Sequence, residues 1–168
     1  MIDEPLIDGD GVIYYWKKNS DGFNALSHVS AGEFTAVIRG VDKGRKVIKG
    51  GVHTTAALAA AAKLGIQPIK IEALDNGVRR VYFDHKDFSF SQLKQMKEFY
   101  DRTPDYVIGG KTLFPESWLA ADIVKAAREV VSTAQRRGAC YLAVVSGVRV
   151  QVNVRESEVV TLFPHWNQ

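Results

Sequence analysis

Two histidines and one distant lysine are the residues of this chain with the clearest potential for acid–base chemistry. His28 precedes Gly32-Glu33. His53 follows Gly50-Gly51, and Lys111 follows a further pair of glycines. One imidazole can accept a proton while the other donates one, and a fixed ammonium can stabilise the negative charge that develops on a phosphate. These groups are a minimal set for cleaving RNA through its own 2′-hydroxyl.

His53 directly precedes an alanine-rich stretch that predicts a helix over 54–65, capped by Thr54 or Thr55. The free N–H groups and partial positive charge of a helix start favour a neutral imidazole and a bound phosphate. We expect Gly50-Gly51 to let the backbone come close to a ligand. The alternative is a histidine that only packs at the helix start. The helix has few polar positions, which predicts burial on most of its sides.

The remaining candidate groups have plainer interpretations. Taken alone, His28 is typical of a half-buried structural histidine, and Lys111 of a solvated surface lysine. His85 and His165 are expected at the surface, and Cys140, which lies in an apolar stretch, is predicted to be a buried structural thiol. No H-x-x-x-H pair and no second cysteine support a metal site, so we expect neither a metal nor another cofactor.

The composition is that of a globular domain. The chain has 168 residues, of which 46% are hydrophobic and 24% charged, and we expect one domain over 1–168 with 1–22 as its least certain segment. No apolar run is long enough to span a bilayer, so no membrane segment is expected. The first residues lack the pattern of a secretory signal, although release from a longer secreted protein stays open.

Basic residues cluster between the two histidines. The net charge of +3 and the pI near 9.0 indicate a mild preference for polyanions. Lys43, Arg45, Lys46 and Lys49 form either a solvated loop or a rim that attracts phosphate. We assign Lys46 and Lys49 to substrate binding.

Apolar periodicity and turn residues predict an α+β domain with no regular βαβ alternation. Asn76-Gly77 predicts a hairpin turn because both residues accept positive φ angles. Ser89 to Gln92 fits a capping box, in which the two side chains satisfy each other's backbone N–H groups.

The predicted helices cover 54–65, a segment from 89 that stops before Pro104, and 119–136 with Gly138 beyond its end. The predicted strands cover 34–39, 69–73, 78–83, 140–145, 148–154 and 159–163, and short connections make the last three an antiparallel meander. Turns are predicted at 8–11 and 19–22, around the apolar block 12–16.

Four motifs in a fixed order carry a family resemblance. They are His28-x-x-x-Gly32-Glu33, Gly50-Gly51-Val52-His53, Lys111-x-x-Phe114-Pro115-x-x-Trp118 and Thr161-Leu162-Phe163-Pro164. With these motifs the chain resembles the bacterial EndoU nucleases, which are often toxin domains of contact-dependent inhibition and other polymorphic toxin systems. The matches run from about residue 25 to residue 164.

The resemblance implies an α+β fold shared with barnase-, colicin- and RelE-type ribonucleases, with N-terminal helices and antiparallel sheets. It implies metal-independent cleavage of single-stranded RNA, often tRNA near uridine, to 2′,3′-cyclic phosphate and 5′-hydroxyl ends. As a toxin, the domain would be secreted or delivered within a larger protein and would act in the cytoplasm of the target cell. A cognate immunity protein would neutralise it, and we expect a monomer.

The resemblance also suggests a role for each motif residue. We assign His53 as general base because of its predicted helix start, His28 as general acid and Lys111 as the cation that stabilises the phosphorane, although the order of acid and base could be reversed. Thr161 would hydrogen-bond a base edge, and Phe163 would stack on the base. Phe163 stands where the family usually has tyrosine, so it lacks a hydroxyl for phosphate or sugar. Two rivals stay open: a non-catalytic RNA-binding domain of the same fold, and a protein-interaction module of the immunity type.

Overall fold

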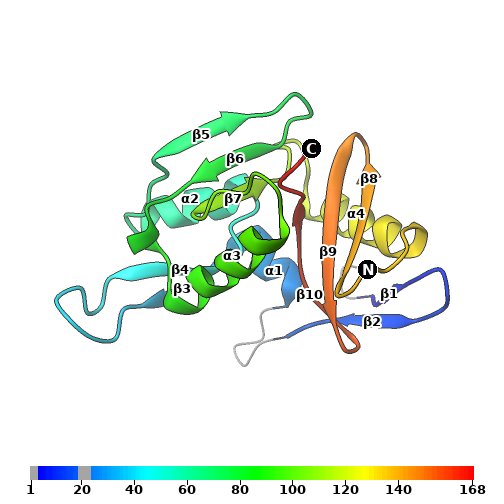
Figure 1. Cartoon of the computed structure of the whole chain (residues 1–168), viewed down its shortest axis with the longest axis horizontal. Coiled ribbons are helices and arrows are strands. Elements are labelled where there is room, and N and C mark those ends of the chain that lie inside the picture. Colours follow the sequence, from blue (N-terminus) through cyan, green and yellow to red (C-terminus); the bar gives the residue numbers. More distant parts are fainter. Residues whose placement is uncertain (1–3, 19–23) are drawn as a thin grey trace.

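A computed structural model describes residues 4–18 and 24–168 as an α+β fold, which confirms the predicted class (Figure 1). The predicted turn at 19–22 lies outside the described residues, as does the start of the uncertain segment 1–22. A five-stranded sheet and helix α4 form one part of the molecule, and the smaller sheets with α2 form the other. No helix in the described ranges is long and apolar enough to cross a membrane.

The late meander is confirmed and forms three of the five strands of the larger sheet, from the central strand to one edge. Its strands β8 (Cys140–Val145), β9 (Val148–Arg155) and β10 (Glu158–Pro164) pair antiparallel. Ser146 and Gly147 both have positive φ (49° and 79°), so the β8–β9 connection is a tight two-residue turn. The sheet is wider than predicted because β2 (Ile13–Trp16) pairs parallel to β10 and β1 (Leu6–Ile7) pairs with β2.

Helix α4 (Ala120–Thr133) buries the predicted apolar face against this sheet. Ile123, Val124 and Val130 are among its buried side chains. The helix ends at Thr133 because Ala134 takes an extended backbone (ψ 153°), three residues before the predicted end at residue 136. Arg136 and Arg137 therefore lie in the turn that enters β8.

The second part contains two small sheets. Strands β5 (Lys70–Ala73), β6 (Arg79–Tyr82) and β7 (Gly110–Leu113) form one sheet, and β3 (Glu33–Ala36) and β4 (Lys46–Gly50) form the other. The predicted β5–β6 hairpin is confirmed. In its turn Gly77 has positive φ (87°) and Asn76 does not, which differs from the turn geometry expected for the pair.

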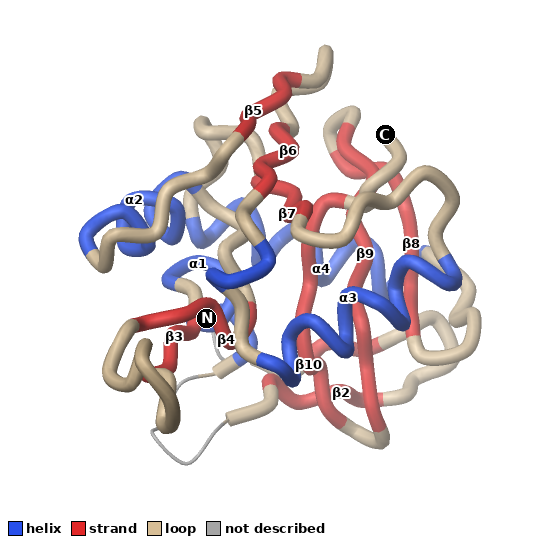
Figure 2. The backbone as a smooth tube through the Cα atoms, turned by 60° about the vertical axis from the view of Figure 1, so that its left-hand side comes forward, coloured by secondary structure: helices blue, strands red, loops and turns tan. Residues whose placement is uncertain are grey.

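The remaining helical elements are α1 (Ala25–Ala31), whose buried residues pack into the core of the five-stranded sheet, α2 (Thr55–Lys63), the 3₁₀ turn η1 (His85–Asp87) and α3 (Phe90–Arg102). Figure 2 shows α3 in front of β9 and β10, and these elements line one groove. The predicted burial of α2 on most sides was wrong, since only Ala57 and Ala61 are buried. Alanine side chains are short, so a single face is enough to pack α2 on its neighbours. Cys140 is only half-buried, which corrects its expected burial.

Candidate functional site

A groove of about 1200 Å³ runs between α3 and the outer face of the meander. Its lining brings together six of the seven residues predicted for the site: His28, His53, Lys111, Thr161, Phe163 and Lys49. Lys46 is exposed on β4 and does not line the groove. Arg45 forms an ion pair with Asp87 at 3.2 Å, so the basic cluster contributes to the groove chiefly through Lys49.

His53 lies immediately before α2, as predicted, and Thr54 caps the helix by accepting a hydrogen bond from the N–H of Ala57 at 3.1 Å. Its Nδ1 is 2.7 Å from the carbonyl oxygen of Thr112. A carbonyl only accepts, so Nδ1 carries the proton and Nε2 keeps a lone pair. Burial lowers the pKa of His53 well below its usual 6.5, and the charge of Lys111 acts in the same direction. His53 is therefore neutral at pH 7.

His28 lies on α1 and donates from Nδ1 to Glu33 Oε1 at 2.8 Å. Burial lowers the pKa of His28 below its usual value and outweighs the carboxylate of Glu33, which raises it. The carboxylate fixes the ring and leaves Nε2 for a substrate. Glu33 was not assigned a role from the sequence, although it stands in the first family motif.

The pair Gly50-Gly51 makes room for His28, and both glycines also line the groove, so the close approach of a ligand stays a prediction. A Cβ at Gly50 would lie 2.5 Å from Cε1 of the His28 ring, and a Cβ at Gly51 would lie 1.9 Å from the His28 carbonyl oxygen. Val52 then has a φ of 66°, which is strained for a β-branched residue. Hydrogen bonds hold the backbone of His53 on both sides, from its N–H to Val29 O and from the N–H of Phe114 to its carbonyl.

Lys111 lies on β7 and is only 8% exposed. Its ammonium donates to Oε1 of Gln92 at 2.8 Å, and no carboxylate of the described residues lies within 4.0 Å of it. Burial lowers the pKa of Lys111 to about 7. A buried ammonium with only a neutral partner keeps its charge available for an anion that enters the groove.

Gln92 is a candidate site residue that the sequence patterns did not predict, since its side chain accepts a hydrogen bond from Lys111. One of the two hydrogen bonds of the predicted capping box is present: Ser89 Oγ accepts from the N–H of Gln92 at 3.2 Å. The Gln92 side chain instead turns to Lys111, while the N–H of Ser89 donates to Ile48 O. In sequence, a glutamine that completes a capping box and one that holds a lysine look the same.

We expect Gln92→Leu to lower kcat for RNA cleavage by about 10²-fold, because a loosely held ammonium no longer meets the phosphate in the productive geometry. Gln67→Leu, at an exposed position, is the matched control. Gln92→Glu distinguishes a structural role of Gln92 from a role in the reaction. It restores an acceptor, so its melting temperature should return to that of the wild type, but its carboxylate neutralises Lys111 and kcat should stay low. Recovery of kcat in Gln92→Glu would mean that Gln92 has only a structural role.

Phe163 lies on β10 with its ring stacked on His53, at a centroid distance of 5.3 Å and an interplanar angle of 23°. Phe99 contacts the Phe163 ring edge to face at 5.8 Å. One face of Phe163 therefore already covers the His53 imidazole and contributes to its burial. Thr161 is half-buried two residues earlier on the same strand.

The two other histidines differ from each other. His85 is exposed as predicted, and its Nε2 donates to Ile108 O at 3.0 Å. His165 is half-buried in the groove lining rather than at the surface, and burial lowers its pKa. In residues 4–18 and 24–168, no group of three or more His, Cys, Asp or Glu side chains is arranged to hold a metal.

Comparison with known proteins gives one match. A family model described as "Bacterial EndoU nuclease" matches residues 24–165, which include every residue of the site described above. No curated protein and no solved structure matches the chain.

Proposed function

The chain belongs to the bacterial EndoU nuclease family, and from this membership and its groove we propose that it is a metal-independent endoribonuclease for single-stranded RNA. The observation that carries the proposal is the pair of anchored imidazoles. His53 and His28 both bind protein through Nδ1, so both Nε2 atoms are left for a substrate in a groove that Lys111 also lines. This arrangement supports catalysis over RNA binding alone, because binding does not require two fixed imidazoles.

In the proposed reaction, His53 Nε2 takes the proton of the 2′-hydroxyl. The 2′-oxygen then bonds to the adjacent phosphorus while the bond from phosphorus to the 5′-oxygen breaks. His28 Nε2 gives a proton to the leaving 5′-oxygen, and the ammonium of Lys111 stabilises the negative phosphorane. The products are a 2′,3′-cyclic phosphate and a 5′-hydroxyl. A neutral His53 suits the base. The carboxylate of Glu33 partly offsets the burial that lowers the pKa of His28, so only a minority of His28 is protonated at pH 7 and available as the acid.

Substrate contacts follow from the groove lining. Thr161 is proposed to bind a base edge, and the face of Phe163 opposite His53 to stack on the base. Lys49 is proposed to bind a phosphate. Lys46 lies outside the groove and would act only by attracting RNA over a longer distance.

We propose tRNA as the substrate, with cleavage near uridine, and an antibacterial toxin as the biological role. The domain would be secreted or delivered within a larger toxin, act as a monomer in the target-cell cytoplasm, and be blocked by an immunity protein. An immunity protein with acidic groups would complement the basic groove.

The deciding experiment is incubation of the purified protein with total tRNA in the presence of EDTA. We expect fragments with 2′,3′-cyclic phosphate and 5′-hydroxyl ends, in the same yield with and without EDTA, because the proposed steps use only protein side chains. Loss of cleavage in EDTA that added Mg²⁺ or Mn²⁺ restores would contradict the metal-independent mechanism. Specific tRNA binding with no cleavage would favour the RNA-binding alternative.

A further inference from the structure

Three arginines lie at the end of the groove beside the β9–β10 turn. They are Arg136, Arg137 and Arg155, here called the distal basic site, and all three line the groove that contains His28, His53 and Lys111. None of them belongs to the four sequence motifs of the family. We propose that the distal basic site binds phosphates of RNA nucleotides several positions away from the cleaved bond. This inference rests on the proposed ribonuclease function and extends it to the length of the substrate.

The backbone brings these residues together from two parts of the chain. At the start of β8, Arg137 bridges to Cys140, whose register partner on β9 is Asn153, two residues before Arg155. The N–H of Val154 also donates to Ala139 O at 2.8 Å, which connects the β8 entry to the end of β9. Lys17 lines the groove as well, but its charge adds to the burial that lowers the pKa of His28, so it lies nearer the catalytic residues.

Two cations of the distal basic site are available to a ligand. In the described ranges, Arg137 and Arg155 have no carboxylate within 4.0 Å. Arg136 is held in place by hydrogen bonds to Gly138 O and to the hydroxyl of Tyr14. The carboxylate of Asp8 partly compensates the charge of Arg136. Guanidinium groups bind phosphate with paired N–H donors, so three arginines at one end of a groove suit a nucleic-acid backbone.

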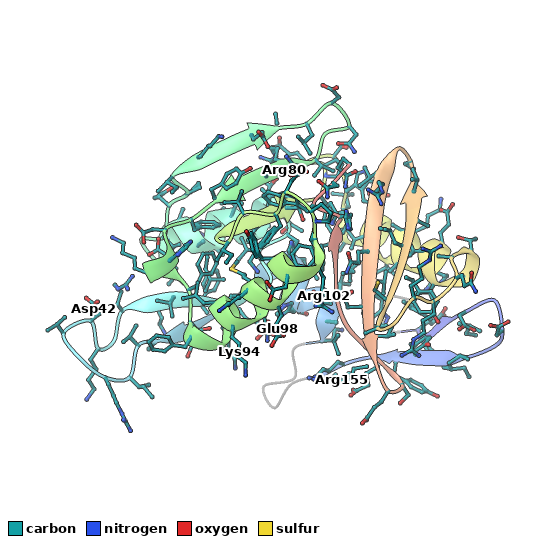
Figure 3. All side chains as sticks on the ribbon, in the orientation of Figure 1. Asp42, Arg80, Lys94, Glu98, Arg102 and Arg155 are labelled. Carbon is teal, nitrogen blue, oxygen red and sulfur yellow. The ribbon has the colours of Figure 1, made fainter. Side chains whose placement is uncertain are left out.

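Charge is concentrated in the groove rather than spread over the surface. The lining contains seven Lys and Arg residues, and its three carboxylates are Glu33, Glu98 and Glu156. The whole chain has a net charge of only +3, so the surface outside the groove has no basic excess. Figure 3 shows a further cation, Arg102, on the α3 side of the groove, with Arg155 at the lower end of β9. A single strand that leaves the catalytic residues along this groove would meet positive charge on both walls.

The middle of the groove also suits single-stranded RNA. Alternate residues of β9, Gln151 and Asn153, line the groove between Phe163 and Arg155. The Gln151 amide donates to the Asn153 side chain at 2.8 Å, so the two form a connected row of polar groups. Unstacked bases expose polar edges that such a row can bind, whereas a duplex hides them. Polar side chains therefore lie along the groove between the catalytic residues and the distal basic site.

The test uses the double variant Arg137→Gln with Arg155→Gln and the control Lys125→Gln, which removes an exposed charge from α4, outside the groove lining. Binding to a 2′-O-methyl oligoribonucleotide, which cannot be cleaved, is measured by fluorescence anisotropy at several salt concentrations. Each phosphate contact to a single strand contributes about 0.7 to the slope of log Kd against log salt, so the double variant should lose about 1.4. We expect Kd to rise about tenfold at low salt for the double variant and to stay unchanged for the control.

Cleavage supplies the second measurement. The double variant should cleave a dinucleotide with wild-type kcat/KM, because this substrate does not reach the distal basic site, and should show a raised KM for a long RNA. An unchanged salt slope, or an equal loss on the dinucleotide and the long RNA, would overturn the proposal. The anisotropy measurement needs no turnover, so it tests the distal basic site independently of cleavage. If the wild-type protein binds RNA through these arginines but does not cleave it, the proposed function is contradicted and the distal basic site is still supported.

Discussion

His53→Ala is expected to lower kcat for RNA cleavage by about 10²–10⁴-fold, the range typical of a lost general base. A carbonyl fixes the tautomer of this imidazole, since its Nδ1 donates to Thr112 O and leaves Nε2 to accept the proton. Its pKa is held well below 6.5, so the loss should persist from weakly acidic to neutral pH. Cleavage of a uridine-containing oligonucleotide under single-turnover conditions measures the chemical step directly.

His53 is buried and covered by Phe163, so the test needs a variant that keeps the local packing. In His53→Asn the side-chain amide can replace Nδ1 as the donor to Thr112 O, which should preserve the melting temperature without supplying a base. The control is His85→Ala, which removes an exposed histidine outside the groove lining. A folded His53→Asn protein that cleaves RNA at near the wild-type rate would disprove the assignment of His53 as base.

His28→Ala should have an effect of similar size, because His28 and His53 are proposed to serve the same chemical step. The double variant should lose little more than either single variant, since residues that act as a unit in catalysis are strongly non-additive. Full additivity of the two losses would indicate that the two imidazoles act independently. The close packing of His28 on Gly50 makes a second variant useful, and His28→Asn keeps a polar group near Glu33.

Local sequence patterns were sufficient to predict the elements that rest on local interactions. The meander followed from alternating apolar residues and tight turns, and α4 from an apolar face with helical spacing. Helix α1 was missed because it has only seven residues and depends on tertiary support, such as the bond from the N–H of His53 to Val29 O. The pairing of β2 with β10 joins opposite ends of the chain, and no local pattern encodes it.

The convergence of the three catalytic candidates was predicted, but the reasons for their geometry were not. The motif glycines Gly50-Gly51 were linked to a ligand, whereas His28 fills the space beside them. Gln92 satisfied a capping pattern in sequence, and only the fold shows that its side chain lies against Lys111. Arg137 was attributed to a helix end, and the early end of α4 moves it into the groove. In each case a contact between distant segments decides the role of the residue.

Lys111→Met is expected to lower kcat by about 10²–10³-fold, because the charge that stabilises the phosphorane is lost. The same variant should be more stable than the wild type at pH 6. Folding places the Lys111 ammonium in a buried site, and its pKa falls from 10.5 to about 7. Between these two pH values the unfolded chain binds one proton more than the folded chain, so the free energy of unfolding of the wild type rises with pH. Below pH 7 the cost of burying the charge is present in full.

Methionine has a similar length and no charge, so Lys111→Met removes this pH-dependent cost. Its stability advantage over the wild type should therefore be largest near pH 6 and shrink steadily from pH 7 to pH 10. The loss of the hydrogen bond to Gln92 is the same at every pH and cannot produce this trend. Melting temperatures of both proteins across this range measure it, and a difference that does not change with pH would show that Lys111 is not a buried ammonium. A buried ammonium lowers the stability of the protein, and a neutral side chain would fit the same position, so its presence is best explained by binding of an anion. If Lys111→Met loses cleavage and gains stability, that anion is identified as the phosphate of the substrate.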